Sequence, residues 1–482
     1  MQNSRQVYLL DPQKLPPETI AVTFAKTSRS PQTFKEIAAD LTNEKSAEFH
    51  EKWVVGYGHS SVAEHAVLHI AVENISRLAI ECLESNRLAS YTEKSSRYQK
   101  WGKESFYIPL ELSDPELIKS FIETNQLLFH TYHQSLPVLQ KEAAKHFPIR
   151  DDENETAWER RIRAQYVDVA RFLLPAAALA NVGMTINARA LEHALKKMLS
   201  HPLEEVRSVG IEIKQVAQEN VPTLVKYANQ VPSWLNAYSN FTQENNNFSL
   251  SNSSSEWCRL VDYDVQAEKK VLAALIYRFG HNDFVHIWDH LTQASPEEID
   301  RLAQLAVKDL QKYDVPLREF EFGNFTFELL MDQGAYFEIK RHRIMTQTAQ
   351  SLTTELGYVV PKWIKSSNFE KLYHEVMSVA RKTYRKIAEF NPEVAAYIVP
   401  NAFNRRILLQ GNLRALDHLI TLRSAANAHF SVRRISQRIA EEIFNVSPLA
   451  KHWIRNNPLE TWQEIEKDHF DETMCLMGDG VE

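Results

Sequence analysis

The sequence predicts a chain of mixed helices and strands, built from two tandem copies of one domain. In each copy an alternating apolar stretch is followed by a helix and then by a polar loop, over Ala66–Tyr98 and again over Phe325–Ser351. A second pattern, N-x-R-A-L-acid-H, begins at Asn187 and recurs at Asn412. A duplicated domain accounts for both patterns in the same order.

The composition of the chain is that of an ordinary globular protein. Its 482 residues are 44% hydrophobic and 24% charged, with a net charge of −7 that provides no general attraction for nucleic acid. The three cysteines form no CxxC pair, and no apolar run reaches the length of about 18 residues that a membrane span needs. We therefore expect a cytoplasmic protein without a nucleic-acid or membrane partner. The absence of GxGxxG and GxxxxGK[ST] argues against the common nucleotide-binding loops.

An Asn- and Ser-rich stretch near the midpoint of the chain predicts the boundary between the copies. Residues 236–255 lack periodicity and are typical of a linker. The predicted domains are therefore residues 1–235 and residues 256–482.

Hydrophobic periodicity predicts the main elements of each copy. In the first copy these are a helix over Ala39–Trp53, a strand over Ala66–Val72, a helix from Ile75, a short strand over Phe106–Pro109, one or two long helices over Pro115–His146 and a helix over Asn187–Leu195. In the second copy they are a strand over Phe325–Leu330, a helix from Tyr336, a long helix over Phe369–Phe390 and a helix over Asn412–Ile420.

The polar loop of the first copy has the side chains of an oxyanion site. Ser95 and Ser96 supply hydroxyls, and Arg87 and Arg97 supply guanidinium groups that suit a phosphate. The same residues also fit a polar loop that follows an amphipathic helix. Arg171, within an apolar run, is either a structurally paired arginine or an anion ligand.

The stretch from His59 to His65 has two histidines and Glu64, but not the spacing of a helical metal site. HExxH places its histidines four residues apart, whereas these stand six apart. We expect no metal here and favour a polar site for a cofactor or substrate.

Two motifs carry a resemblance to a known family. The triad Arg341-His342-Arg343 in the second copy and the stretch from Arg87 to Tyr98 in the first together resemble the signature of the flavin-dependent thymidylate synthases. The resemblance implies an α+β fold with a twisted antiparallel sheet and packed helices, once per copy. Members of that family are homotetramers with sites between subunits, so two chains of this protein are expected to form a homodimer that is a pseudo-tetramer.

The resemblance also implies a reaction. In this family dUMP is converted to dTMP, methylenetetrahydrofolate donates the carbon, NADPH reduces the flavin and FAD carries the hydride. Arginines are expected to stabilise the negative charge that develops on the pyrimidine. The alternatives are a flavoenzyme of this fold that acts on another pyrimidine nucleotide, and a non-catalytic assembly protein that binds flavin or nucleotide.

Matching the family motifs assigns a role to each candidate site residue. The expected substrate-binding residues are Arg87, Glu93, Ser95, Arg97 and Arg171. The expected cofactor-binding residues are His59, Asn187, Arg189, Arg341, His342, Arg343, Asn412 and Arg414. Arg423 is the expected catalytic residue, because it matches the arginine that binds and activates the pyrimidine.

Neither copy keeps the whole motif. In the first copy the triad has become Ser85-Asn86-Arg87, and Met198 stands where the activating arginine belongs. In the second copy Ala396 replaces the equivalent of Arg171, and the polar loop has lost its final arginine. This pattern fits composite sites shared by the two copies, and it also fits decay toward a pseudoenzyme.

Overall fold

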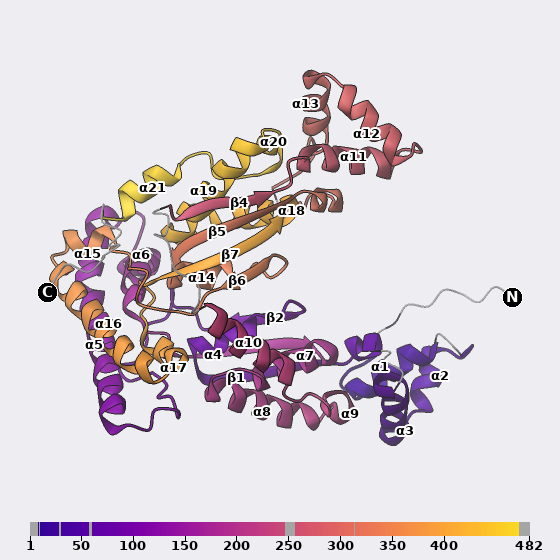
Figure 1. The fold of residues 1–482 in the computed structure, drawn as a ribbon, viewed down its shortest axis with the longest axis horizontal. Coiled ribbons are helices and arrows are strands. Elements are labelled where there is room, and N and C mark those ends of the chain that lie inside the picture. Colours follow the sequence, from indigo (N-terminus) through magenta and orange to yellow (C-terminus); the bar gives the residue numbers. More distant parts are fainter. Residues whose placement is uncertain are drawn as a thin grey trace. The chain divides into compact units, whose positions relative to one another are not determined.

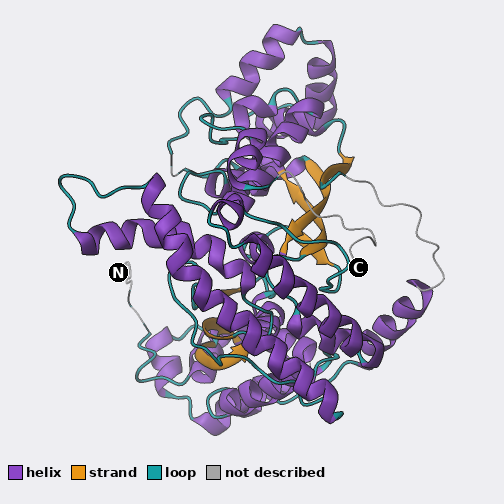
Figure 2. Cartoon of the chain, turned by 90° about the vertical axis from the view of Figure 1, so that its left-hand side faces the viewer, coloured by secondary structure: helices purple, strands orange, loops and turns teal. Residues whose placement is uncertain are grey.

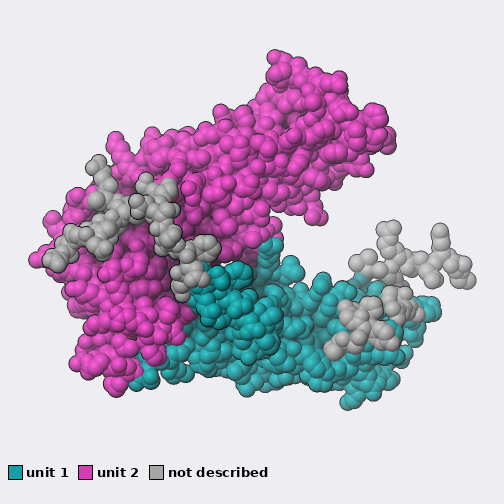
Figure 3. Space-filling view, in the orientation of Figure 1, with its two compact units in different colours: residues 1–94, 107–113, 178–251 teal, residues 95–106, 114–177, 252–482 magenta. Residues whose placement is uncertain are grey.

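The computed structural model describes residues 8, 10–27, 30–56, 60–245, 256–312 and 314–471. The chain forms two compact units (Figure 3). Unit 1 comprises residues 1–94, 107–113 and 178–251, and unit 2 comprises residues 95–106, 114–177 and 252–482. Helices make up most of the described chain (Figure 2). No helix among the described residues is long and apolar enough to cross a membrane.

Unit 1 is built on a three-stranded antiparallel sheet with the order β1-β3-β2. The strands are β1 (Val67–Ser76), β2 (Ala89–Glu93) and β3 (Leu179–Asn187). Alternation along β3 buries Val182, Met184 and Ile186, as expected for a sheet with one covered face. Three helices pack on these strands and on one another: α4 (Arg77–Glu84), α7 (Ala188–Leu199) and α8 (Glu204–Gln218).

Short helices complete unit 1. They are α1 (Pro17–Thr27), α2 (Phe34–Ala39), α3 (Asn43–Phe49), η1 (His50–Gly56), η2 (Ser60–His65), α9 (Pro222–Val225) and α10 (Pro232–Asn245). The helix expected over Ala39–Trp53 is thus divided between α3 and η1. The first half of the expected linker over residues 236–255 lies in helix α10, and residues 246–255 lie outside the described residues.

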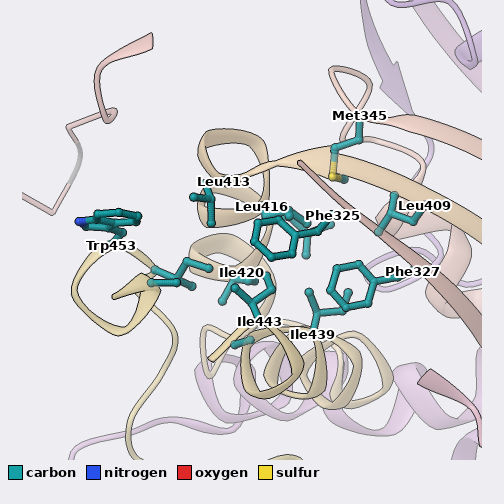
Figure 4. Close-up of a cluster of buried hydrophobic side chains, with 14 of the residues drawn as sticks. Phe325, Phe327, Met345, Leu409, Leu413, Leu416, Ile420, Ile439, Ile443 and Trp453 are labelled. Atoms are coloured by element: carbon teal, nitrogen blue, oxygen red, sulfur yellow. The ribbon is translucent and has the colours of Figure 1, made fainter. Parts of the chain in front are cut away.

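Unit 2 contains a four-stranded antiparallel sheet with the order β4-β5-β7-β6. Its strands are β4 (Cys258–Tyr263), β5 (Asn324–Asp332), β6 (Thr346–Ala349) and β7 (Asn404–Asn412). Helices α18 (Leu413–Arg423) and α19 (Phe430–Val446) cover the sheet, and Phe327, Leu409 and Ile439 are fully buried between them (Figure 4).

Further helices of unit 2 lie at the ends of the sheet or beside it (Figure 1). They are α11 (Ala267–Phe279), α12 (Phe284–Gln293), α13 (Pro296–Leu305), η4 (Arg318–Phe322), α14 (Gln333–Ile339), α15 (Lys362–Ser366), α17 (Pro392–Ala395), η5 (Ala396–Ile398), α20 (Ala450–Trp453) and α21 (Trp462–His469).

The three-stranded sheet of unit 1 matches three strands of the unit 2 sheet, β5-β7-β6, which supports the duplication inferred from the sequence; β4 is an additional edge strand. In each set of three, the last strand in the chain, β3 or β7, lies between the other two, and its last residue pairs with the start of the first, β1 or β5. That last residue is Asn187 in one copy and Asn412 in the other. Each asparagine caps the next helix by accepting a hydrogen bond of 2.9 Å from a backbone N–H.

Unit 2 also contains helices from the first copy. α5 (Pro115–His146) forms one continuous helix where the sequence predicts one or two. It packs beside α16 (Glu370–Phe390), and Thr124 and Thr383 form a 2.7 Å hydrogen bond between them (Figure 1). α6 (Glu155–Ala170) and the turn η3 (Arg171–Leu173) follow α5. The compact units therefore do not coincide with the sequence repeats.

The matching prolines of the two copies meet within unit 2. Pro175 and Pro400 form an antiparallel bridge, and Ala176 N donates to Val399 O at 3.0 Å while Asn401 N donates to Leu174 O at 3.0 Å. The bridge joins equivalent segments of the two copies directly after η3 and η5.

The short strand predicted over Phe106–Pro109 does not form, since only Phe106 makes an isolated bridge. Its ring instead packs at 5.9 Å from that of Phe129 on α5. Pro109 lacks the N–H that a strand would need to extend the pairing.

Candidate active site

The C-terminal end of α6 places two charged side chains of the first copy in the interior of unit 2. Asp168 lies in the last turn of this helix, and Arg171 begins η3. The side chain of Arg171 is only 1% exposed. Its Nη2 donates to Gly334 O at 3.2 Å and its Nη1 donates to Ser96 Oγ at 3.4 Å. A buried guanidinium group needs such acceptors and a counter-charge.

The loop after β2 brings Arg97 onto Asp168. Arg97 Nε and Nη2 donate to the two carboxylate oxygens of Asp168 at 2.8 and 2.7 Å. Nη2 also donates to Asn427 O at 3.2 Å, and the backbone N–H of Arg97 donates to Ser95 Oγ at 3.2 Å. Burial lowers the pKa of Arg97, but the bidentate pair with Asp168 outweighs burial and the net shift is upward. Arg97 is therefore a fixed positive charge.

The second copy contributes Glu338 and Arg423 to the same unit. Glu338 lies on α14, whose N-cap Asp332 accepts a hydrogen bond from Ala335 N at 2.7 Å, and Arg423 ends α18. Arg423 Nη1 donates to Glu338 Oε2 at 2.9 Å, and Arg171 Nη1 lies 3.9 Å from Glu338 Oε1. Glu338 thus joins an arginine of the first copy to an arginine of the second.

These side chains form one group that draws on both copies. We call the following six side chains the arginine cluster: Arg97, Arg171, Arg341, Arg423, Asp168 and Glu338. Arg341 is exposed and acts electrostatically on Glu338 from three residues further along the chain. Four guanidinium groups and two carboxylates give the cluster a net charge of +2.

The cluster keeps Glu338 ionised. Burial alone would raise the pKa of this carboxyl group, but Arg341, Arg171 and Arg423 together hold the pKa below its ordinary value. A partly exposed cationic cluster beside hydroxyl groups is suited to a phosphate group.

His342 orients Arg423 as a neutral hydrogen-bond acceptor. Arg423 Nε donates to His342 Nε2 at 2.9 Å, so the ring proton belongs on Nδ1. The pKa of His342 is lowered to about 3 by burial first and then by Arg423 and His418. The residue does not carry charge at neutral pH, although it lies within the triad expected to bind the cofactor.

This pKa predicts a specific acid sensitivity. In the unfolded chain a histidine titrates near pH 6.5, so lowering the pH from about 6.5 toward 3 adds a proton to the unfolded state first and favours unfolding. His342→Gln retains an acceptor for Arg423 without this titration. We expect the variant to lose less stability on acidification, by up to about 1.4 kcal/mol per pH unit, in urea unfolding series. Replacement of the exposed His286 by Gln should leave the loss of stability on acidification as in the wild type. If His342→Gln were as sensitive to acid as the wild type, the assignment of His342 as a neutral acceptor would be contradicted.

Two of the expected substrate-binding residues belong to unit 1. The Glu93 side chain is 1% exposed and lies 3.3 Å from the guanidinium group of Arg77. Arg87 is exposed in the turn between α4 and β2. The division between the units falls between Lys94 and Ser95, inside the sequence motif.

The asparagine–arginine helices that match flavin-binding positions have the same local structure in both copies. Asn187 and Asn412 are N-caps, and the arginine two residues later pairs with a glutamate in both copies. Arg189 pairs with Glu64, and Arg414 donates to Glu321 at 2.8 Å and to Pro316 O at 2.8 Å. These two Arg–Glu pairs were not expected from the sequence. Arg343 is half-buried after α14, and His59 lies outside the described residues.

Unit 1 has a cavity next to one of these pairs. It has a volume of about 680 Å³ and is lined by Phe24, Phe49, Trp53 and His65, together with Glu64, the partner of Arg189. Aromatic walls with a nearby arginine are suited to a planar ligand that bears an anionic group. Among the described residues, no group of three or more His, Cys, Asp or Glu side chains is arranged to hold a metal ion.

Two functional candidates could have been found in the sequence. Asp168 stands in the apolar run Tyr166-Val167-Asp168-Val169-Ala170, three residues before Arg171. Glu338 stands three residues before Arg341 on a predicted helix. An acid one helical turn from a conspicuous arginine is a pairing signal, although here the closer partners are remote in sequence.

Comparison with known proteins gives a consistent result. A family model described as "Thymidylate synthase complementing protein" matches residues 10–223 and 259–449, one segment in each predicted copy. A UPF0159 protein from Chlamydia muridarum is 30% identical over 434 residues, which cover 86% of this chain and 82% of that protein.

Shorter relatives match about half of the chain. A flavin-dependent thymidylate synthase from Clostridium tetani is 28% identical over 222 residues, which cover 46% of this chain and 84% of that protein. The crystal structure of a flavin-dependent thymidylate synthase from Helicobacter pylori, complexed with FAD and dUMP, is 21% identical with a TM-score of 0.28. It covers 44% of this chain and 96% of that one.

Proposed function

Because the chain belongs to the thymidylate synthase complementing protein family, we propose that it is a flavin-dependent enzyme of thymidylate synthesis. In this proposal the substrate is dUMP, the product is dTMP, the carbon donor is methylenetetrahydrofolate and NADPH is the reductant. The observation that carries the proposal is the arginine cluster, since its net charge of +2 complements the charge of a phosphate monoester, about −1.5 to −2 at pH 7.

The proposal gives each side chain of the cluster a distinct task. Arg97 and Arg171 bind the phosphate with the hydroxyl groups of Ser95 and Ser96, which lie on the same loop. Arg423 stabilises negative charge on the pyrimidine, because its guanidinium group is fixed by Glu338 on one side and by His342 on the other. A preorganised donor of this kind does not need to rearrange during the reaction.

The residues of unit 1 fit a flavin in their chemistry. In this proposal the aromatic side chains of the cavity around Trp53 would hold FAD, and Arg189, the partner of Glu64 in the cavity lining, would offer a positive charge to its diphosphate. When bound, FAD supplies the hydride for the reduction. The protein would contribute aromatic side chains beside the planar ring system and an arginine for the anionic part of the cofactor.

Rescue of a thymidine-requiring bacterial strain tests the function. The wild-type chain is expected to restore growth without thymidine, and Arg97→Ala is expected to fail at equal protein level. Glu355→Gln is the matched control, because Glu355 forms an exposed ion pair with Arg385 outside the arginine cluster. Its variant should grow like the wild type.

The failure of rescue would be informative when combined with flavin retention. A protein that keeps FAD after desalting but does not rescue growth would favour the second function, a flavoenzyme that acts on another pyrimidine nucleotide. A protein that neither retains FAD nor rescues growth would favour a non-catalytic assembly protein.

A further inference from the structure

Glu338 lies between the two arginines to which the proposed function assigns different parts of the nucleotide. Its Oε2 accepts the 2.9 Å hydrogen bond from Arg423, and its Oε1 lies 3.9 Å from Arg171. The side chain is 9% exposed, so these interactions act in a region of reduced solvent screening. The negative charge of Glu338 therefore lies where a phosphate would interact most strongly with Arg171 and Arg423.

The second carboxylate of the cluster is held much more firmly. Asp168 accepts two hydrogen bonds of 2.8 and 2.7 Å from Arg97, and its backbone carbonyl accepts a third from His429 at 3.2 Å. Glu338 has one short bond to an arginine and one longer contact to another. Of the two carboxylates, Glu338 is thus the one that an incoming anion can displace from its guanidinium partners.

Charge arithmetic gives the consequence. The cluster has a net charge of +2 with Glu338 ionised and +3 with this position neutral. A like charge next to a bound anion weakens the binding of that anion unless water or the protein screens it. Glu338 should therefore oppose every anion that binds to Arg171 or Arg423.

We propose that Glu338 is an internal competitor for the phosphate of the nucleotide and thereby limits the affinity of the site. The part that concerns a nucleotide rests on the proposed function, whereas the competition with an anion does not. In the protein, Glu338 orients Arg171 and Arg423 and yields to a phosphate group, so that product phosphate esters are released more readily.

The test compares anion and nucleoside binding in the full-length chain. Glu338→Gln retains an amide oxygen that can accept from Arg423 but removes the charge. Calorimetric titration with inorganic phosphate, dUMP and deoxyuridine is expected to show at least about tenfold tighter binding of phosphate and dUMP to Glu338→Gln. Binding of deoxyuridine should not change. Glu338→Asp, with a carboxylate one bond shorter, should also bind phosphate more tightly than the wild type, but less so than Glu338→Gln.

The outcomes are distinguishable from a failure of the proposed function. If Glu338→Gln binds phosphate equally or more weakly, the competitor role is overturned and Glu338 only positions arginines. If only one of Glu338→Gln and Glu338→Asp folds, that variant must still bind phosphate more tightly than the wild type. If the Glu338 variants bind phosphate more tightly than the wild type but no protein binds dUMP, the competition between Glu338 and an anion is supported and the assignment of a nucleotide fails. Glu355→Gln should bind phosphate, dUMP and deoxyuridine with the affinity of the wild type. Tighter phosphate binding by Glu355→Gln would show that the effect of Glu338→Gln comes from the change in net charge of the protein and not from its position.

Discussion

Replacing Asp168 with alanine should lower the free energy of unfolding by about 3–5 kcal/mol, the largest effect that we expect from a single site residue. The Asp168 side chain is 7% exposed and neutralises Arg97 through two short hydrogen bonds. Without it, Arg97 loses its bidentate partner, and Glu338 and Asp332 are the carboxylates that still act on the buried Arg171. Urea unfolding followed by circular dichroism would measure the loss.

An exposed aspartate provides the control for this experiment. Asp300 pairs with His452 at 2.7 Å, but its side chain is 47% exposed. Because solvent screens such pairs, Asp300→Ala should cost less than about 1 kcal/mol. An Asp168→Ala variant as stable as Asp300→Ala would show that Arg97 and Arg171 do not depend on this carboxylate.

Arg97→Ala should weaken dUMP binding by about 1.5–3 kcal/mol, or roughly tenfold to more than a hundredfold. Arg97 lies in the first-copy loop and its side chain is 14% exposed, so one charge-assisted contact to a phosphate would be lost. Calorimetric titration of dUMP into the folded variant measures the change, with circular dichroism to confirm folding.

The equivalent second-copy position is Thr353, which provides the internal control. Its Oγ1 accepts a hydrogen bond from Glu355 N at 3.2 Å and it offers no positive charge. Thr353→Ala should change dUMP binding by less than about 0.5 kcal/mol. An effect as large as that of Arg97→Ala would mean that the two loops are not specialised.

Local pattern was sufficient to predict much of the fold. The sequence predicted the helical region of α5 and the helices that follow strands β3 and β7, because hydrophobic periodicity acts over a few residues. It missed strand β2, since Ser90 and Thr92 read as loop residues although they pair with β3. In this case sheet pairing outweighed local polarity.

The site was predicted as a set of positions without their partners. The sequence identified Arg97 and Arg423, but the pairing of Arg97 with Asp168 spans 71 residues and that of Arg423 with Glu338 spans 85. Partners at such separations depend on the packing of α6, α14 and α18, which no local spacing encodes. For the same reason the division of the motif between the two units, after Lys94, was not foreseen.

The stoichiometry of dUMP binding tests the central claim most directly, namely that one nucleotide site is built from both copies. Calorimetry of the wild-type chain should give one dUMP per chain, and Arg97→Ala from the first copy and Arg423→Ala from the second should each weaken that single event. Two equivalent sites per chain would contradict the account. So would full dUMP affinity in Arg423→Ala, because the second copy would then contribute nothing to the site.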